Sequence, residues 1–371
     1  MPDHPLTAVG GGGVIVEAEG PLGAREGWST VASLSTARRS LAAAEAGGLV
    51  YAIGGRDSGG NRVASVEEYD PETDTWSTVA SLSTARKRLA AAEADGLVYA
   101  IAGRDSDLNY LASVEEYDPE TDTWSTVASL STARESFAAA EAGGLVYAIG
   151  GTDSDFNDLA SVEEYDPETD TWSTVASLST ERDSLAAAEA GGLVYAIGGD
   201  DGDNTLASVE EYDPETDTWS TVASLSTARR SLAAAGADGL LYAIGGNDSG
   251  GDALASVEEY DPETDTWSTV ASLSTARRTL AAAEAGGLVY AIGGNDGDNE
   301  LASVEELTFQ SFIDVYSATG DTLFKINDPN GNLLNRTTGR EVTGDSLIAR
   351  DGETIAAITE TNARVYRTEE T

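Results

Sequence analysis

Short apolar segments, glycine pairs and polar loops follow one another in an order that returns every 47 or 48 residues. In one copy, Leu41–Ala46 is a run of small apolar residues, and the β-rich run Leu49–Ile53 follows a glycine pair. Ala64–Tyr69 then alternates between apolar and polar positions, which indicates a half-buried strand. Trp76–Ala80 follows a proline-containing turn. Each copy therefore predicts four short strands, and no amphipathic helix of sufficient length separates them.

The tryptophans of the protein mark these copies. They are Trp28, Trp76, Trp124, Trp172, Trp219 and Trp267. Repeats of this length are typical of β-propeller blades, in which each unit is a four-stranded sheet around a central channel. The innermost strand needs small side chains because the blades converge there, and the triple alanine that starts at Ala42 fits that position. The sequence predicts an all-β, six-bladed propeller.

The two ends of the repeat region complement each other. The last copy breaks off after Glu306 without its tyrosine and tryptophan, whereas the repeat region begins with an isolated tryptophan segment, Trp28–Ser33. Joining them completes six four-stranded blades and leaves no open sheet edge. We therefore predict that the N-terminal strand closes the last blade.

Three regions follow from this pattern: an N-terminal extension over 1–27, the propeller over 28–307, and a small β-rich extension over 308–371. In the last region Phe312–Tyr316, Thr322–Ile326 and Thr354–Ile358 indicate short strands. The segment Val14–Glu19 also has β character, and we expect it to pair with this extension.

The repeat resembles the kelch repeat. Its marks are a glycine pair, a tyrosine about fifteen residues later and a tryptophan seven residues after that, as in Gly54-Gly55, Tyr69 and Trp76. The second copy differs at the first glycine, which is Ala102. The resemblance implies a propeller closed by a blade of mixed origin. It also implies that the loops around one mouth of the channel bind partners.

The protein is strongly acidic, with 65 Asp and Glu against 21 Lys and Arg and a net charge of −44. Ordinary nucleic-acid binding is disfavoured, because it depends on cations that neutralise phosphates. The acidic, lysine-poor composition resembles that of proteins from salt-saturated cytoplasm. The sequence contains no cysteine, no signal-peptide pattern and no apolar run near the ~20 residues that cross a bilayer. We expect a cytoplasmic monomer that binds neither membrane nor nucleic acid.

The charge predicts that stability depends on salt. We expect the melting temperature to rise steeply between dilute buffer and molar KCl, because a Debye length of about 3 Å at about 1 M salt screens the repulsion between acids. Thermal melts across a KCl series measure this. A melting temperature that did not change with salt would contradict the halophilic interpretation.

Three charged sets recur once per copy. Aspartates after the glycine pair would circle one face, where they could bind a hard cation such as Ca²⁺ or cap their own loops: Asp57, Asp105, Asp153, Asp201, Asp248 and Asp296. Glutamates towards the other end of the inner strand are expected to be solvated or to line the channel: Glu45, Glu93, Glu141, Glu189 and Glu284. Arginines just before the inner strand are expected to bond backbone carbonyls or a neighbouring acid: Arg38, Arg86, Arg134, Arg182, Arg229 and Arg277.

Two short stretches vary between copies, one after the repeated arginine and one after the glycine pair, while the DPETDTW turn is unchanged. Contiguous blades place our predicted ligand-binding cations there: Arg39, Arg56, Lys87, Arg88, Arg104, Arg230 and Arg278. Blades 3 and 4 place acids there instead: Glu135, Asp153, Asp155, Asp158, Asp183, Asp200 and Asp201. We predict a basic arc facing an acidic arc. The arginines suit an anionic group on a protein or a glycan. Neutral loop drift and plain ion pairing are the competing interpretations.

The sequence favours binding over catalysis. The one histidine, His4, precedes the ring, which nearly excludes a histidine-based triad or metal site, and we expect no cofactor. The prediction is a non-catalytic scaffold that binds a protein or glycan on the loop face. Two alternatives stay open. Six-bladed kelch rings include sialic-acid epimerases, so a carbohydrate enzyme of that type is one. A recently amplified or consensus-like propeller without an evolved ligand is the other, because the copies are nearly identical.

Overall fold

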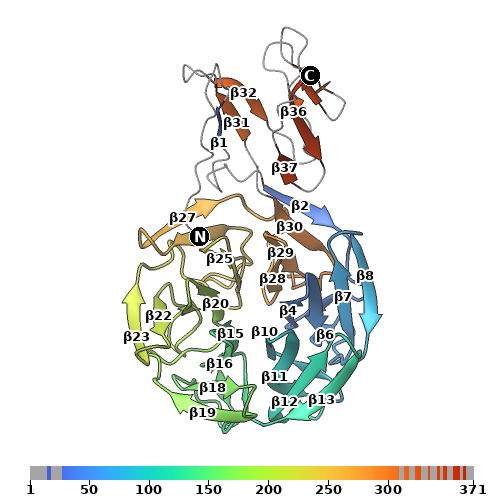
Figure 1. Ribbon diagram of the computed structural model, residues 1–371. Coiled ribbons are helices and arrows are strands. Elements are labelled where there is room, and N and C mark those ends of the chain that lie inside the picture. The colour runs from blue at the N-terminus through green and yellow to red at the C-terminus, as the bar shows by residue number, and fades with distance from the viewer. Residues whose placement is uncertain are drawn as a thin grey trace. The chain divides into compact units, whose positions relative to one another are not determined.

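The computed structural model of the protein describes residues 27–308 with their side chains and, outside that range, the backbone of short strands. The protein divides into two units, residues 27–307 and a second unit that combines 1–26 with 308–371. The first unit is a ring of six four-stranded blades (Figure 1), which confirms the predicted all-β propeller. The part of the chain that the structure describes contains no helix with the length and apolar character of a membrane span.

Blades 1 to 5 each run in sequence order from the innermost strand to the outermost. Blade 1 consists of β4 (Ala42–Ala46), β5 (Leu49–Ile53), β7 (Val66–Asp70) and β8 (Thr75–Val79). Blade 2 consists of β10 (Ala90–Ala94), β11 (Leu97–Asp105), β12 (Tyr110–Asp118) and β13 (Thr123–Val127). Blade 3 consists of β15 (Ala138–Ala142), β16 (Leu145–Ile149), β18 (Val162–Asp166) and β19 (Thr171–Val175).

Blades 4 and 5 repeat this order, and blade 6 is of mixed origin. Blade 4 consists of β20 (Ala186–Ala190), β21 (Leu193–Ile197), β22 (Val209–Asp213) and β23 (Thr218–Val222). Blade 5 consists of β24 (Ala233–Ala237), β25 (Leu240–Ile244), β26 (Val257–Asp261) and β27 (Thr266–Val270). Blade 6 consists of β28 (Ala281–Ala285), β29 (Leu288–Ile292), β30 (Val304–Thr308) and β2 (Gly27–Val31). Since β2 lies beside β30, the predicted closure by the N-terminal strand is confirmed.

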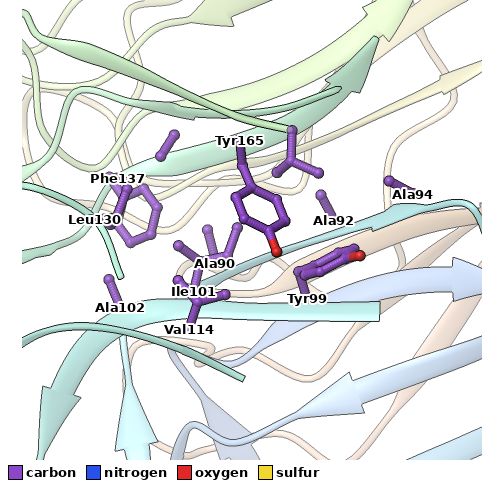
Figure 2. Packing of buried hydrophobic residues seen from close by; sticks show 12 residues of the cluster. Ala90, Ala92, Ala94, Tyr99, Ile101, Ala102, Val114, Leu130, Phe137 and Tyr165 are labelled. Carbon is purple, nitrogen blue, oxygen red and sulfur yellow. The ribbon is translucent and has the colours of Figure 1, made fainter. Parts of the chain in front are cut away.

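Apolar side chains pack between neighbouring blades. Figure 2 shows the interface of blades 2 and 3, where Tyr99 and Ile101 pack with Phe137 and Tyr165. The rings of Tyr99 and Tyr165 meet edge to face, with centroids 5.4 Å apart. Equivalent clusters fill other interfaces around the ring. Full burial of one large apolar residue contributes about 1.5–3 kcal/mol, so the contacts between blades are a main source of stability.

Hydrogen bonds of the outer strands also join each blade to the one before it. The indole Nε1 of Trp76 donates to the carbonyl of Ala32 at 2.9 Å, and Trp28 closes the circle by donating to Ala271 at 3.0 Å. The carboxylate of Asp74, in the DPETDTW turn, accepts the backbone N–H of Ala32 at 2.7 Å. The unchanged sequence of this turn therefore has a structural cause.

The glycine pair lies where two blades approach closely. Gly54 has φ +60°, and a Cβ there would be 2.7 Å from the carbonyl oxygen of Arg86 in the next blade. Gly55 has φ +102°, and a Cβ there would be 2.9 Å from the carbonyl oxygen of Arg39. Both the conformation and the close approach favour glycine. In blade 2, however, Ala102 occupies the first position with φ +51°.

Ala102 therefore carries backbone strain that glycine would remove. We expect Ala102→Gly to raise the free energy of unfolding by about 1 kcal/mol, because a left-handed L-residue costs roughly 1–2 kcal/mol and the added backbone entropy offsets part of the gain. Chemical denaturation measures the change, with Gly54→Ala as the matched reverse substitution, which should destabilise. A less stable Ala102→Gly variant would contradict the strain.

The second unit is built from both ends of the sequence. β1 (Ile15–Glu17) pairs with β31 (Ile313–Tyr316), as expected from the sequence, and β31 pairs with β32 (Thr322–Ile326). The remaining strands form a pair and a three-stranded sheet: β33 (Leu333–Leu334), β34 (Glu341–Val342), β35 (Ser346–Ile348), β36 (Thr354–Thr359) and β37 (Asn362–Arg364).

Candidate functional site

The six repeated arginines are buried inside the blades. In blade 3, Arg134 is fully buried, and its Nη1 donates to the carbonyls of Gly150 at 2.9 Å and Ser161 at 3.1 Å. Its Nη2 donates to Glu163 at 2.7 Å, and that carboxylate also accepts the N–H of Ser131. Burial lowers the pKa of Arg134, and the nearby charge of Glu163 opposes this. The predicted structural role of these arginines is confirmed.

The aspartates that follow the glycine pair cap their own loops. Asp57 accepts the N–H of Asn61 at 2.8 Å, and its bonds with that residue lower the pKa of the carboxyl. The other five aspartates likewise accept a hydrogen bond from a backbone N–H of their own loop: Asp105, Asp153, Asp201, Asp248 and Asp296. Within the described residues, no group of three or more His, Cys, Asp or Glu side chains is arranged to hold a metal ion.

The innermost strands enclose a central channel with about 230 Å³ of free space, lined by alanines and by the repeated glutamates. Each glutamate accepts an N–H of its hairpin turn, as Glu45 does from Gly48 at 2.6 Å. The channel-lining prediction is confirmed. Blade 5 has Gly236 instead, where a Cβ would be 2.3 Å from the carbonyl oxygen of Glu189. Blades 4 and 5 therefore approach too closely here for a side chain.

A closed circle of backbone hydrogen bonds surrounds the other end of the channel. It is formed by the second variable residue of each copy: Ser40, Arg88, Ser136, Ser184, Ser231 and Thr279. Each donates its N–H to the carbonyl of its counterpart in the preceding blade at 2.7–3.1 Å, and Ser40 donates to Thr279. All six residues have φ between 50° and 57°. We call this circle the mouth ring.

The two variable stretches lie side by side at this mouth. β3 (Arg38–Arg39) pairs with β6 (Arg56–Asp57), which places Arg39 opposite Arg56. β9 (Arg86–Lys87) pairs with β11, which places Lys87 opposite Arg104. In blade 4, two acids face each other in the same way, Asp183 and Asp200. We call the surface formed by these stretches the loop face. Like charges in directly opposite positions destabilise a strand pair, so stability does not explain this arrangement.

The loop face holds every cation of the propeller apart from the structural arginines. Residues 27–308 contain fourteen Lys and Arg, and the six buried arginines leave eight. Seven are the ligand-binding residues predicted from the sequence. The eighth is Arg62, which sequence reasoning missed although it lies in the variable loop of blade 1.

Half of these eight cations have a carboxylate partner. The pairs are Arg39–Glu300 at 3.3 Å, Arg88–Glu135 at 2.8 Å, Arg104–Glu135 at 3.5 Å and Arg230–Asp200 at 2.9 Å. Among the described residues, no ion pair is formed by the other four, Arg56, Arg62, Lys87 and Arg278. The ion-pairing interpretation therefore accounts for one half of the set and leaves the other half unexplained.

Cations of blades 6, 1 and 2 lie close enough to affect one another. Burial lowers the pKa of Lys87 to about 8, and the charge of Arg88 adds to that effect. Burial also lowers the pKa of Arg39, with the charge of Arg56 adding to it. We define these residues as the cation cluster: Arg39, Arg56, Arg62, Lys87, Arg88, Arg104 and Arg278.

Acids gather on blades 3 and 4 of the same face. Burial raises the pKa of Asp183 to about 6, and the neighbouring Asp158 and Asp200 add to the shift. Arg230 pairs with Asp200 and so lies at the acidic side, outside the cation cluster. The acids of blades 3 and 4 therefore lie opposite the cation cluster, but the loops of the cationic blades also carry acids, among them Asp57, Asp105 and Glu300, so the predicted basic arc is mixed in charge.

Three large side chains on the loop face were not predicted as site residues: Leu108, Tyr110 and Phe156. The rings of Tyr110 and Phe156 meet edge to face, with centroids 6.0 Å apart. The guanidinium of Arg104 lies 4.9 Å from the centroid of Tyr110. The sequence does hold one indication of these residues: Leu108 and Phe156 occupy the loop position that Gly60 holds in the first copy.

The repeat, the six-bladed ring and the variable loop face together define a kelch-type scaffold. The Kelch motif matches residues 37–83 and 85–131, and the KLHDC2/KLHL20/DRC7 Kelch-repeats domain matches residues 129–294. The chain belongs to the kelch-repeat β-propeller family, whose members are in general protein-binding scaffolds.

A solved structure gives the same fold. The protein titled "Structure of YjhT" is 15% identical to this chain with a TM-score of 0.65, and the match covers 77% of this chain and 99% of that chain. At that identity the likeness shows the fold alone. None of the curated proteins compared with the sequence matches it.

Proposed function

We propose that this protein is a non-catalytic binding module that holds an anionic group of a protein or glycan on the loop face, against the cation cluster. The distribution of charge carries the proposal. Within the propeller of this acidic protein, the cations other than the six buried arginines are gathered on one face, and four of them form no ion pair with the described residues. Gathering like charges costs free energy, and an anionic ligand would offset that cost.

The chemistry of the cluster supports a carboxylate, sulfate or phosphate as the bound group. Guanidinium groups present a planar fork of donors that such oxyanions accept in pairs. The available contacts are the four cations of the cluster that form no ion pair within the described residues: Arg56, Arg62, Lys87 and Arg278. Arg88 and Arg104 already form ion pairs with Glu135, whose side chain is buried with 2% exposed.

Charge reversal at two of the four unpaired positions, Arg56 and Lys87, tests the binding face. Ligands are first selected for the full-length protein from a displayed peptide library and an array of anionic glycans, in about 0.1 M KCl, where the charges of the cluster are less screened. We expect Arg56→Glu with Lys87→Glu to weaken the selected ligands by about tenfold or more while changing the melting temperature little, because both side chains are only partly buried and lie outside the core. Titration calorimetry and thermal melts measure the two effects. Arg88 and Arg104 are left unchanged, because each forms an ion pair with Glu135.

The matched control reverses charges on the opposite end of the blades. Glu72→Arg with Glu120→Arg changes two exposed residues of the DPETDTW turns and should leave binding unchanged. Equal weakening by this control would show that the loop face is not the binding face. Selection of no ligand at all would favour a propeller without an evolved ligand, and turnover of a bound sugar would favour the enzyme.

A further inference from the structure

Two loops hold bulky residues in a backbone conformation that glycine adopts elsewhere in the propeller. Leu108 in blade 2 has φ +72° and Phe156 in blade 3 has φ +65°, whereas blades 1 and 5 have Gly60 and Gly251 there, at +84° and +88°. In all four loops this residue donates its N–H to the carbonyl of the aspartate three residues earlier, at 3.0–3.2 Å. The turn therefore requires a left-handed residue. Leucine and phenylalanine adopt that conformation at a cost in stability.

The side chains of Leu108 and Phe156 contribute little burial free energy to the folded state. Among the described residues, Leu108 and Phe156 are the large apolar side chains that remain exposed, at 53% and 72%. Buried apolar side chains stabilise a protein because they leave water, and here most of that gain is absent. Strain and exposure at the same two residues point to a role outside folding.

The exposed residues adjoin the cation cluster. Phe156 lies against the ring of Tyr110, and Tyr110 lies under the guanidinium of Arg104. The Nε of Arg104 also donates to the carbonyl of Leu108 at 3.0 Å, which fixes the arginine beside that loop. An apolar patch and a set of donors for carboxylates therefore form one continuous surface on blades 2 and 3.

We propose that Leu108, Tyr110 and Phe156 form an apolar anchor that takes an aromatic or aliphatic side chain of a partner protein segment, while carboxylates flanking that side chain bind the cation cluster. This inference rests on the proposed function and names its ligand class. Aromatic residues beside arginine are the side chains that dominate binding energy at protein interfaces. Two of the three anchor residues, Leu108 and Phe156, have no hydrogen-bonding side-chain group, and the hydroxyl of Tyr110 is the one such group the anchor offers to a sugar, so an apolar side chain of a protein segment fits it better than a glycan does.

Salt separates the two halves of such a contact. At about 1 M KCl, exposed charges further apart than about 3 Å are largely screened, whereas burial of apolar surface is not weakened by the salt. Binding that persists in molar KCl should therefore depend on the anchor. Binding in dilute salt should depend on the cations as well.

The experiment uses the full-length protein and a displayed library of random twelve-residue peptides, selected in about 0.1 M and about 1 M KCl. We expect the selected peptides to combine Asp or Glu with Phe, Tyr, Trp or Leu. Leu108→Gly with Phe156→Gly should weaken them by about tenfold in molar KCl. This variant gives both loops the residue found at Gly60 and Gly251, so its melting temperature should stay equal or rise. Ser106→Gly with Ser154→Gly, in the same loops, should leave binding unchanged.

Each other outcome overturns the proposal in a recognisable way. If the selected peptides were acidic but contained no apolar residue, and the double-glycine variant bound them equally well, the anchor would be refuted. The proposed function would remain supported. Recovery of no peptide would remove the anchor. If the array of anionic glycans used to test the proposed function then gave ligands, the loop face would be assigned to a glycan. Self-association of the full-length protein that the double-glycine variant abolishes, without peptide binding, would identify a second copy of the protein as the occupant.

Discussion

Deletion of residues 1–33 is expected to destabilise the propeller far more than any other truncation at either end. The deletion removes β2, the outer strand of blade 6, and exposes β30 as an unpaired edge that can recruit other molecules. It also removes the bond from Trp28 to Ala271 and the packing of Val31 against blade 6. We expect a loss of roughly 5 kcal/mol or more, together with aggregation.

Two further truncations separate closure from the second unit. Deletion of 1–26 removes β1 but keeps β2, and deletion of 309–371 removes the C-terminal strands. Both should leave the main unfolding transition nearly unchanged in calorimetry at the same salt concentration. Closure by β2 would be refuted if the 1–33 and 1–26 truncations melted alike.

Truncation of one buried arginine is expected to have the next largest effect. Arg134→Ala should lower the free energy of unfolding by about 3–5 kcal/mol, because it leaves Glu163 as a buried charge without its counterion. It also leaves the carbonyls of Gly150 and Ser161 without this donor. Denaturant titration measures the loss. Arg230→Ala is the matched control: its pair with Asp200 involves a 43% exposed arginine, so the change should stay within about 1 kcal/mol.

A double variant decides what the buried pair contributes. Replacing a simple buried ion pair by apolar residues is often neutral, but Arg134 and Glu163 also bond five backbone groups of nearby segments. Arg134→Met with Glu163→Met should therefore remain clearly less stable than the unsubstituted protein. If the double variant regained full stability, the hydrogen bonds from the pair to the backbone would contribute nothing, and each charge would serve only to neutralise the other.

The fold was predictable from the sequence because the same physical requirement recurs in every copy. The spacing of the tryptophans gave the number of blades, and the isolated segment around Trp28 indicated how the ring closes. The structural role of Arg134 and its equivalents followed from their presence in every repeat. The unchanged DPETDTW turn was predictable as a feature, and its cause, the bond from Asp74 to the preceding blade, appeared only in the structure.

The candidate site was predictable only in outline. Positions along the repeat placed the cations other than the buried arginines on the loop face, together with the acids of blades 3 and 4. Which cations are paired depends on contacts between blades, such as Arg39 with Glu300, that no local pattern encodes. The left-handed conformation of Leu108 and Phe156 was also invisible, because a sequence shows a bulky loop residue without showing its φ.

The mouth ring has a consequence for how such a protein can diversify. Each of its six bonds joins one backbone N–H to one backbone carbonyl, and the side chains at these positions differ, with arginine in one copy, serine in four and threonine in one. The junction between neighbouring copies is therefore independent of side-chain identity at the rim. Duplication or exchange of whole repeats can combine new sets of rim residues while every junction stays the same, so a family of binding specificities can arise from one protein by recombination of its copies.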